Sequence, residues 1–435
     1  MKQFLKMNKQ TIRENTLISL IFIMSICNKW TLFLAILLSL ILLKRGVIGV
    51  IQLIYLYMIR TLMNSTFDLG ESTVFITYMQ YILIYVIGIF FLIRYIKKWT
   101  RSYIMFNFAF SSMNLMLIYI LISLVVSDYP MMSVIKIINY FIPLTIIVLL
   151  ICLIKDIEEL VIWTAQQVKL LIIFSLLPIV LKPTNYFIKG ESFHGFLSDY
   201  KTFAVVLLMG LLILILYILR EYEINLLNFF VVLIAIIELY LTDSKLAWVT
   251  LMISLLIILF LLNLKKRYKY PMILGILMLA ITSIFHPLVH SLVVNFIFKG
   301  NSIENVLMPK DNQIKNIQYA FETHPFLGSG FGIPMHHANG YLKNLNIEAG
   351  NIIFEVIIFT GMIGLTCYVI YILKVILLAR KPFRVTIVLF IATLLVNCVE
   401  IIMFKSLNAG ALCYILWGIY LKDGIQDEKY NFKTI

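Results

Sequence analysis

Charged residues are scarce in this chain, and their scarcity decides its class. Only 13% of the 435 residues are charged, whereas 62% are hydrophobic and the mean hydropathy is +0.97. A soluble domain cannot hide that much apolar surface, but a lipid bilayer accommodates it. The composition therefore predicts an all-α, polytopic membrane protein.

The chain also has few cysteines, and their positions favour no chemistry. All 5 lie inside apolar segments at unrelated spacings, so we expect neither a disulfide framework nor a metal site. The polar segments contain no phosphate-binding P-loop and no DxD-type nucleotide-sugar motif, so we expect no cofactor. The first apolar run lacks a small-residue cleavage site, and we expect no cleavable signal peptide.

The net charge of +14 is carried by short basic runs between the apolar segments. Such runs orient membrane proteins during insertion. No basic stripe interleaved with aromatic residues is present. We therefore expect the lipid bilayer, and no nucleic acid, as a partner.

About fourteen apolar runs qualify as transmembrane spans, within a range of about twelve to fourteen. They lie near residues 12–28, 30–43, 46–66, 72–93, 102–126, 133–154, 159–181, 202–219, 224–241, 245–263, 271–290, 351–373, 385–404 and 408–421. The first two are short, and one long span is the alternative to two. With two spans, the side that holds both termini carries about twice as many basic residues as the other, which predicts cytoplasmic termini.

We interpret residues 1–435 as a single integral membrane domain with two informative outer loops. The first loop covers residues 182–201, and the second, much larger loop covers residues 291–350. We expect short helices in the large loop, one of them beginning near Asp311 and ending before Pro325. The predicted cytoplasmic loops are too short for a catalytic domain, so any reaction would occur on the outer side.

Histidines are concentrated in the polar sequence of this outer side. His194, His324, His336 and His337 lie there, out of 6 histidines in the chain. Histidine is the natural general base near neutral pH. His336 and His337 are our catalytic candidates, with His194 in reserve, whereas we expect His324 to be structural. The alternative for each is a capping or packing role.

Cationic residues in or beside the spans form a second group of candidates. Charges at such positions are costly, so each one is a functional candidate. Lys245 opens a span after Ser244, and Arg60 lies one turn before the outer end of its span. A cation at either position would bind a lipid phosphate. The alternative for Lys245 is an interfacial lysine that reaches toward the headgroups.

The segment FLGSGFG at residues 326–332 alternates large and small residues. Glycine allows backbone amides to approach a ligand closely, so one interpretation is an anion-binding nest. The other interpretation is a tight turn at the membrane surface.

Together these features resemble the O-antigen polymerase and ligase superfamily, which comprises Wzy-type polymerases and WaaL-type ligases. The family combines a Pro-Phe/Leu-x-Gly-x-Gly-x-Gly-like segment with an asparagine that precedes a helix ending in Gly-x-x-Gly-Leu. The matching residues here are Pro325, Gly328, Gly330, Gly332, Asn351, Gly361 and Gly364. The family often has a basic residue upstream of the proline, and Lys310 occupies that place.

Two shorter passages carry the same resemblance. Ser244 and Lys245 stand where the family has a Ser/Thr-Arg pair at the start of a span. In the loop before the span at 202–219, Gly195-Phe196 matches the family, whereas Lys201 replaces an asparagine. A lysine binds phosphate as a point charge rather than as a planar fork. Gly350 occupies the usual place of a histidine, so that catalytic assignment does not carry over.

The resemblance implies a polysaccharide polymerase of the bacterial cytoplasmic membrane, acting in capsule, exopolysaccharide or O-antigen synthesis. Its substrate would be an oligosaccharide repeat unit linked to polyprenyl (undecaprenyl) diphosphate, and a flippase and a chain-length regulator would be its partners. The diphosphate would be bound by Lys245, Lys201, Lys310 and Arg60. A histidine at 336 or 337 would take the proton of the attacking hydroxyl, with no metal required.

Two alternative functions stay open. A ligase of the same fold would move finished glycan onto a lipid or wall acceptor, using the same donor chemistry. A lipid-linked oligosaccharide flippase belongs to another class, but we expect a flippase to have short loops on both sides and charges deep in many helices. The long predicted loop at 291–350 argues against it.

Overall fold

The computed structural model describes most of the predicted spans. Its described residues are 2–64, 73–177, 187–188, 192–221, 225–242, 244–262, 322, 324–332, 351–379, 385–398, 400–405 and 407–431. The predicted span at 271–290 and the helix expected after Asp311 lie outside these residues. Every other predicted span coincides with a helix or with a run of helices.

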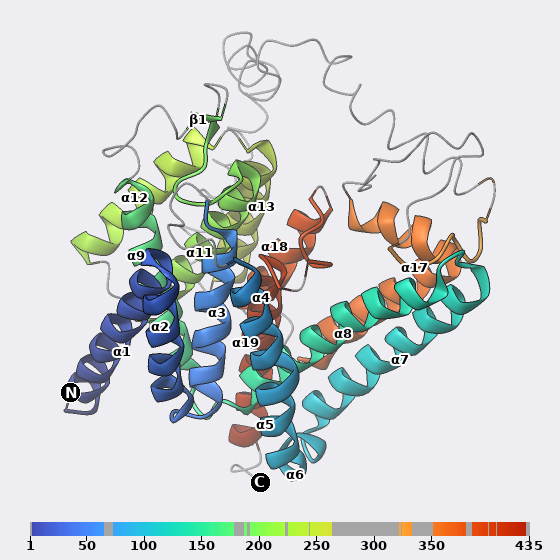
Figure 1. Ribbon diagram of the computed structural model, residues 1–435, viewed down its shortest axis with the longest axis horizontal. Helices are drawn as coiled ribbons and strands as arrows, with labels where there is room; N and C mark the ends of the chain where they lie inside the picture. The colour runs from blue at the N-terminus through green and yellow to red at the C-terminus, as the bar shows by residue number, and fades with distance from the viewer. Residues whose placement is uncertain are drawn as a thin grey trace.

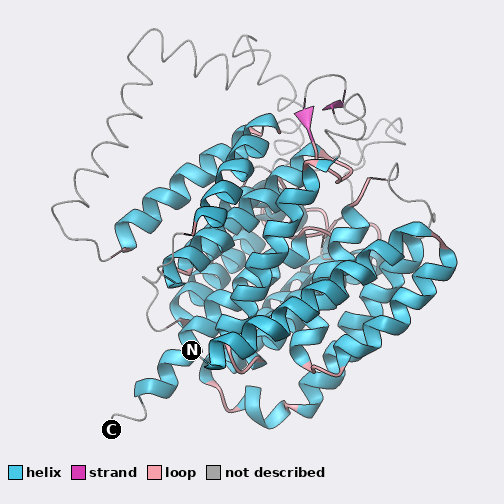
Figure 2. Cartoon of the chain, turned by 90° about the vertical axis from the view of Figure 1, so that its left-hand side faces the viewer, coloured by secondary structure: helices cyan, strands magenta, loops and turns pink. Residues whose placement is uncertain are grey.

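Helices make up nearly all of the described chain (Figures 1 and 2). They are α1 (Lys2–Cys27), α2 (Lys29–Leu43), α3 (Val47–Leu62), α4 (Thr73–Tyr81), η2 (Ile82–Gly88), α5 (Ile89–Arg94), α6 (Ile96–Thr100), α7 (Tyr103–Val126), α8 (Pro130–Leu153), α9 (Ile157–Ser175), α11 (Tyr200–Glu221), α12 (Leu226–Leu241), α13 (Lys245–Leu261), α17 (Ile352–Leu378), α18 (Ile387–Asn397) and α19 (Gly410–Asn431).

Five helical segments are long and apolar enough to cross a membrane. They are Val74–Arg94, Tyr103–Val126, Pro130–Leu153, Tyr200–Arg220 and Ile352–Leu378, and five shorter apolar helices accompany them in the described chain. The expected all-α membrane class is therefore confirmed, whereas the count of about fourteen spans stays a prediction. Two short strands are a small departure from a purely helical chain: β1 (Phe187–Ile188) pairs antiparallel with β2 (Ser192–Phe193).

Asn28 separates α1 from α2, so the first apolar stretch forms two helices rather than one long helix. The Asn28 side chain accepts a hydrogen bond from the Thr31 amide (2.9 Å), and the Thr31 hydroxyl accepts one from the Asn28 amide (3.0 Å). This reciprocal capping box satisfies two backbone donors at the start of α2. The two helices lie side by side (Figure 1).

Helices α3, α8, α11 and α19 form the centre of the bundle, and most of their side chains are buried. Helices that are hydrophobic all round fit such a position, because other helices surround them. The peripheral helices instead expose large apolar side chains, among them Trp30 at 82% and Leu377 at 72%. A bilayer is the environment that suits such a surface.

The bundle has two ends of different character. We call one end the motif face, defined by residues 192–201, 324–332 and 400–405. At the opposite end α1 begins and α19 ends, and we call it the terminal face (Figure 1).

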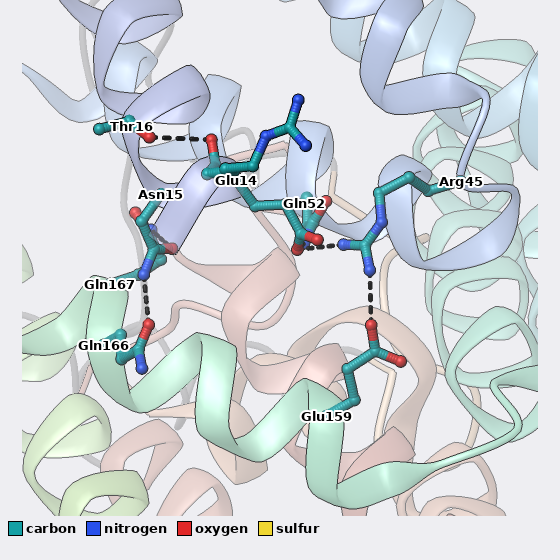
Figure 3. A network of polar contacts seen from close by, with 9 residues as sticks. Glu14, Asn15, Thr16, Arg45, Gln52, Glu159, Gln166 and Gln167 are labelled. Atoms are coloured by element: carbon teal, nitrogen blue, oxygen red, sulfur yellow. Dashed lines mark hydrogen bonds and ion pairs between the residues drawn. The ribbon is translucent and has the colours of Figure 1, made fainter. Parts of the chain in front are cut away.

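A polar network ties the helices together at the terminal face (Figure 3). Arg45, in the turn between α2 and α3, forms ion pairs with Glu14 of α1 and with Glu159 of α9, the latter at 2.5 Å. Gln52 also donates to the Glu14 carboxylate (3.2 Å). On the same face Arg220 at the end of α11 pairs with Asp423 of α19 at 3.0 Å. These contacts fix helices that are distant in the sequence.

Candidate functional site

Helix α17 breaks at Gly361, and the break creates the central feature of the motif face. Gly361 has φ 63° and ψ −166°, a conformation that lies outside any helix and is accessible almost only to glycine. Figure 1 shows the two parts of α17 running in different directions. Such a break leaves carbonyl groups before it and amide groups after it without helical partners.

The glycine-rich loop supplies donors for the orphaned carbonyl groups. The Ser329 amide donates to the Ile358 carbonyl oxygen (2.9 Å), and the Gly330 amide donates to that of Phe359 (3.0 Å). The Ser329 hydroxyl adds a hydrogen bond to Ile358, 29 residues away in the sequence (3.1 Å).

The same loop supplies acceptors for the orphaned amides. The Met362 amide donates to the Pro325 carbonyl oxygen (3.0 Å), and the Ile363 amide donates to that of Phe326 (3.2 Å). We call these four backbone bonds, together with the Gly361 break, the interlock. The interlock joins the two halves of the sequence motif into one unit.

The interlock requires glycine on both of its sides. Gly328 has φ 68°, and a Cβ there would lie 2.6 Å from the Ile358 carbonyl oxygen. A Cβ on Gly361 would collide with the Phe326 carbonyl group. No neighbouring side chain can move aside to relieve these contacts, because the obstructing atoms are backbone atoms.

The loop amides bind the protein itself rather than an anion. The Gly328 amide donates to the His324 carbonyl oxygen (3.0 Å), and the Phe331 amide donates to the Ser123 hydroxyl (3.1 Å). With the two amides of the interlock, all four donors of residues 328–331 are therefore used. The amides of residues 328–331 are therefore not available to an anion in this structure, which favours the tight-turn interpretation for this part of the segment.

Phe331 connects the loop to the last part of the chain. Its ring is only 3% exposed and lies 5.3 Å from that of Phe404, between centroids. Phe404 also packs edge-on against Tyr140 of α8, at 4.7 Å. The segment after α18 is thereby held against the glycine-rich loop.

An ion pair lies in the same segment, and one of its members was not singled out from the sequence. The Lys201 ammonium, in the first turn of α11, lies 3.3 Å from the Glu400 carboxylate. Lys201 is 53% exposed and Glu400 is 23% exposed. The charge of Lys405 acts on the same carboxylate. The only sequence signal for Glu400 is a carboxyl group near the end of the apolar run predicted at 385–404.

The helix in that run ends earlier than expected, so Glu400 lies in the connection between α18 and α19. Burial raises the pKa of the Glu400 carboxyl above its usual range, and the neighbouring Lys201 ammonium opposes this increase. Asn397 explains the early end of the helix. Its side-chain oxygen accepts hydrogen bonds from the amides of Ile402 (2.9 Å) and Met403 (2.8 Å) and folds the chain back.

The structure places His194 and Arg60 in the interior. His194 is 1% exposed, and its Nδ1 lies 2.7 Å from the Leu197 carbonyl oxygen. Arg60 is fully buried, and two of its guanidinium nitrogens lie 3.4 Å from the Ser25 carbonyl oxygen of α1. Both residues therefore contribute to holding the motif end of α3 and its neighbouring loop in place. Their predicted roles toward substrate stay untested.

The remaining candidates are placed as follows. Asn351 caps α17, because its side chain accepts from the Ile353 amide (2.8 Å). The Gly364 carbonyl oxygen accepts from the Tyr119 hydroxyl (3.2 Å). Gly332 lies against Lys136 of α8, whose ammonium donates to the Gly332 carbonyl oxygen.

Several predicted site residues lie wholly or partly outside the described part of the structure. Lys245 begins α13, but its side chain is not among those described. His336, His337 and Lys310 lie outside the described residues. Within the described residues, no three His, Cys, Asp or Glu side chains are grouped as metal ligands.

Comparison with known proteins identifies no relative. No model of a known protein family matches the chain, and no curated protein is significantly similar to it. The resemblance to O-antigen polymerases and ligases therefore stays a hypothesis that rests on the sequence motifs.

Proposed function

We propose that the protein is a polysaccharide polymerase of a bacterial cytoplasmic membrane. It joins oligosaccharide repeat units carried on polyprenyl diphosphate, and the reaction takes place at the motif face, which faces outward. The observation that carries this proposal is the interlock. Residues 325–332 and 361–364 hold the two halves of the family-like motif, and they form one hydrogen-bonded unit.

The charges of the motif face suit a substrate with an anionic leaving group. Lys136, Lys201 and Lys405 are all exposed there. In glycosyl transfer from a lipid diphosphate, negative charge develops on the departing phosphate oxygens, and nearby cations stabilise it. The leaving group is already activated, so the proposed reaction needs neither a nucleotide nor a metal ion.

An apolar cavity supports the lipid part of the proposal. It has a volume of about 260 Å³ and lies between α1, α3 and α9, with Phe22, Ile59 and Leu171 in its wall. Phe196, from the loop at the motif face, closes one part of the wall. A polyprenyl chain has the apolar character that such a wall binds, and its diphosphate would extend toward the motif face.

The polymerase and ligase hypotheses share a donor, so the acceptor distinguishes them. The test is to reconstitute the purified full-length protein in liposomes with the lipid-diphosphate repeat unit of its host and no nucleotide. A ladder of glycans at repeat-unit spacing supports a polymerase. Transfer that requires an added lipid or wall acceptor indicates a ligase instead. Scrambling of the substrate between leaflets with no new glycan indicates a flippase and overturns the proposal.

A further inference from the structure

Glu400 is held in place by its own backbone. Its amide donates to the Val396 carbonyl oxygen (2.9 Å), and Asn397 binds the two amides that follow in the connection. The side chain is partly buried but retains an exposed surface of 23%. The main chain at Glu400 is thereby fixed, and the side chain can meet a substrate without any rearrangement of the backbone.

The partner of Glu400 is less constrained than Glu400 itself. Lys201 is more exposed, at 53%, and it contacts the carboxylate through a single ammonium at 3.3 Å. Ion pairs of this exposed, single-contact kind contribute little to stability. A diphosphate carries more negative charge than one carboxylate, so it competes well for the lysine.

At the terminal face, the ion pairs of Arg45 are enclosed, so an outside ion cannot easily replace one of the partners. Arg45 is 18% exposed and is held between Glu14 and Glu159. The planar guanidinium contacts carboxylates from two helices, and Gln52 binds one of them as well. Lys201 and Glu400 lack this enclosure among the described residues.

We propose that Glu400 accepts the proton of the acceptor hydroxyl, and that the lipid diphosphate frees Glu400 by taking Lys201 from it. This proposal rests on the proposed polymerase function. It gives Glu400 the role that the sequence-based hypothesis assigned to His336 or His337.

The proposed reaction begins with the donor. The diphosphate of the donor binds the ammonium groups of Lys201 and Lys405, which leaves the Glu400 carboxylate unpaired. The acceptor hydroxyl oxygen forms a bond to the anomeric carbon, and its proton moves to Glu400. The bond from the anomeric carbon to the diphosphate oxygen breaks, and its electron pair leaves with the diphosphate. After the diphosphate departs, Glu400 releases the proton to water and pairs with Lys201 again.

The experiment compares three Glu400 variants with a matched control in liposomes that contain the lipid-linked repeat unit. Glu400→Gln keeps the shape of the side chain but cannot accept the proton, so turnover should fall about 100-fold or more. Binding of polyprenyl diphosphate, measured separately, should stay within about threefold. Formate should restore part of the activity of Glu400→Ala, and Glu400→Asp should retain more activity than Glu400→Gln. The control is Glu159→Gln, which removes a carboxylate from the terminal-face ion pair and should leave turnover unchanged.

The pH profile provides a readout that a purely structural role would not alter. A base must be deprotonated to act, so the rate should fall as the pH drops through the pKa of Glu400. The charged groups that act on it are Lys201, Lys405 and Asp199. Lys201 lowers the pKa of Glu400, so Lys201→Ala should raise that pKa and move the acid limb of the profile to higher pH.

The outcomes separate the two proposals. If the wild-type protein makes no glycan, the polymerase function fails and the role of Glu400 fails with it. If the wild type polymerises and Glu400→Gln keeps more than about one tenth of its turnover, only the role of Glu400 is overturned. Loss of diphosphate binding in Glu400→Gln, with no rescue of Glu400→Ala by formate, also overturns it, because that result indicates a structural residue.

Discussion

The two ends of this helix bundle differ in how far their ion pairs are enclosed by the protein. At the terminal face Arg45 is enclosed by two carboxylates and is 18% exposed, whereas at the motif face Lys201 has one carboxylate partner among the described residues and is 53% exposed. An enclosed pair locks helices together, because removing one member strands the other charges. In an open pair, another ion can easily replace one of the two partners. The terminal face therefore serves assembly, and the open pair at the motif face suits the ligand binding that we propose there.

Backbone contacts show a different contrast between the faces. Side chains connect the helices at the terminal face, whereas main-chain hydrogen bonds make the interlock at the motif face. Main-chain bonds leave little room for movement, since neither partner can change rotamer. They tie residues 325–330, which belong to the predicted outer loop 291–350, to the break in α17, and Phe331 connects the same residues to Phe404 in the segment of Glu400.

The largest effect is expected for Gly361→Ala. The new Cβ collides with the Phe326 carbonyl group, and a backbone conformation of this kind costs an alanine about 1–3 kcal/mol. We expect polymer formation in the liposome assay to be lost, with membrane insertion retained. Gly424→Ala in α19 is the matched control. A Cβ on Gly424 would lie 3.2 Å from its nearest neighbours, the Cα and Cβ of Ala379, and the backbone there is helical. Normal polymer from Gly361→Ala would show that the interlock is dispensable.

Gly361 also marks the limit of what the sequence could predict. The apolar runs predicted the described helices well, and polar residues near Asn28 made a break between two short helices one of the alternatives. The apolar run at 351–373 was predicted to be one continuous span, and the glycines at 361 and 364 do not by themselves reveal the break. Its cause is the loop at 325–330, far away in the sequence, and such tertiary hydrogen bonds override local propensity.

Glu400 was missed for a related reason. The apolar run continues past the end of α18, so the sequence does not show where that helix ends. The helix ends because the side chain of Asn397 accepts hydrogen bonds from amides that follow it. Lys201, by contrast, was selected from the sequence alone, through the family resemblance. The sequence therefore identified one member of the ion pair, and only the fold identified the other.

Arg45→Ala tests the terminal face and should act on stability rather than on chemistry. The change leaves Glu14 and Glu159 facing each other without their cation, and losing one member of a mostly buried pair costs about 3 kcal/mol. We expect a lower melting temperature in detergent and unchanged turnover per folded molecule. A normal melting temperature, or a selective loss of turnover, would contradict the role assigned to this face.

Lys201→Ala is the matched change at the motif face. We expect it to weaken substrate binding and to leave stability nearly unchanged. The exposed pair contributes at most about 1 kcal/mol, so the melting temperature should barely change. Loss of one cation that binds phosphate should weaken binding of polyprenyl diphosphate about tenfold. Lys201→Arg, which keeps the charge, should recover most of the affinity. Equal affinity for the wild type and Lys201→Ala would remove Lys201 from the substrate site.

The smallest effect is expected in the apolar cavity, which lies between the two faces. Ile59 lines it, and a tryptophan at this position would occupy part of the space of about 260 Å³. A polyprenyl chain that binds there would then bind less well, whereas a donor with a short lipid would be unaffected. We expect Ile59→Trp to raise the KM for the long-chain donor about threefold and to leave the KM for a short-chain analogue unchanged. Equal changes for both donors would show that the substitution acts through the fold, and that the lipid chain lies elsewhere.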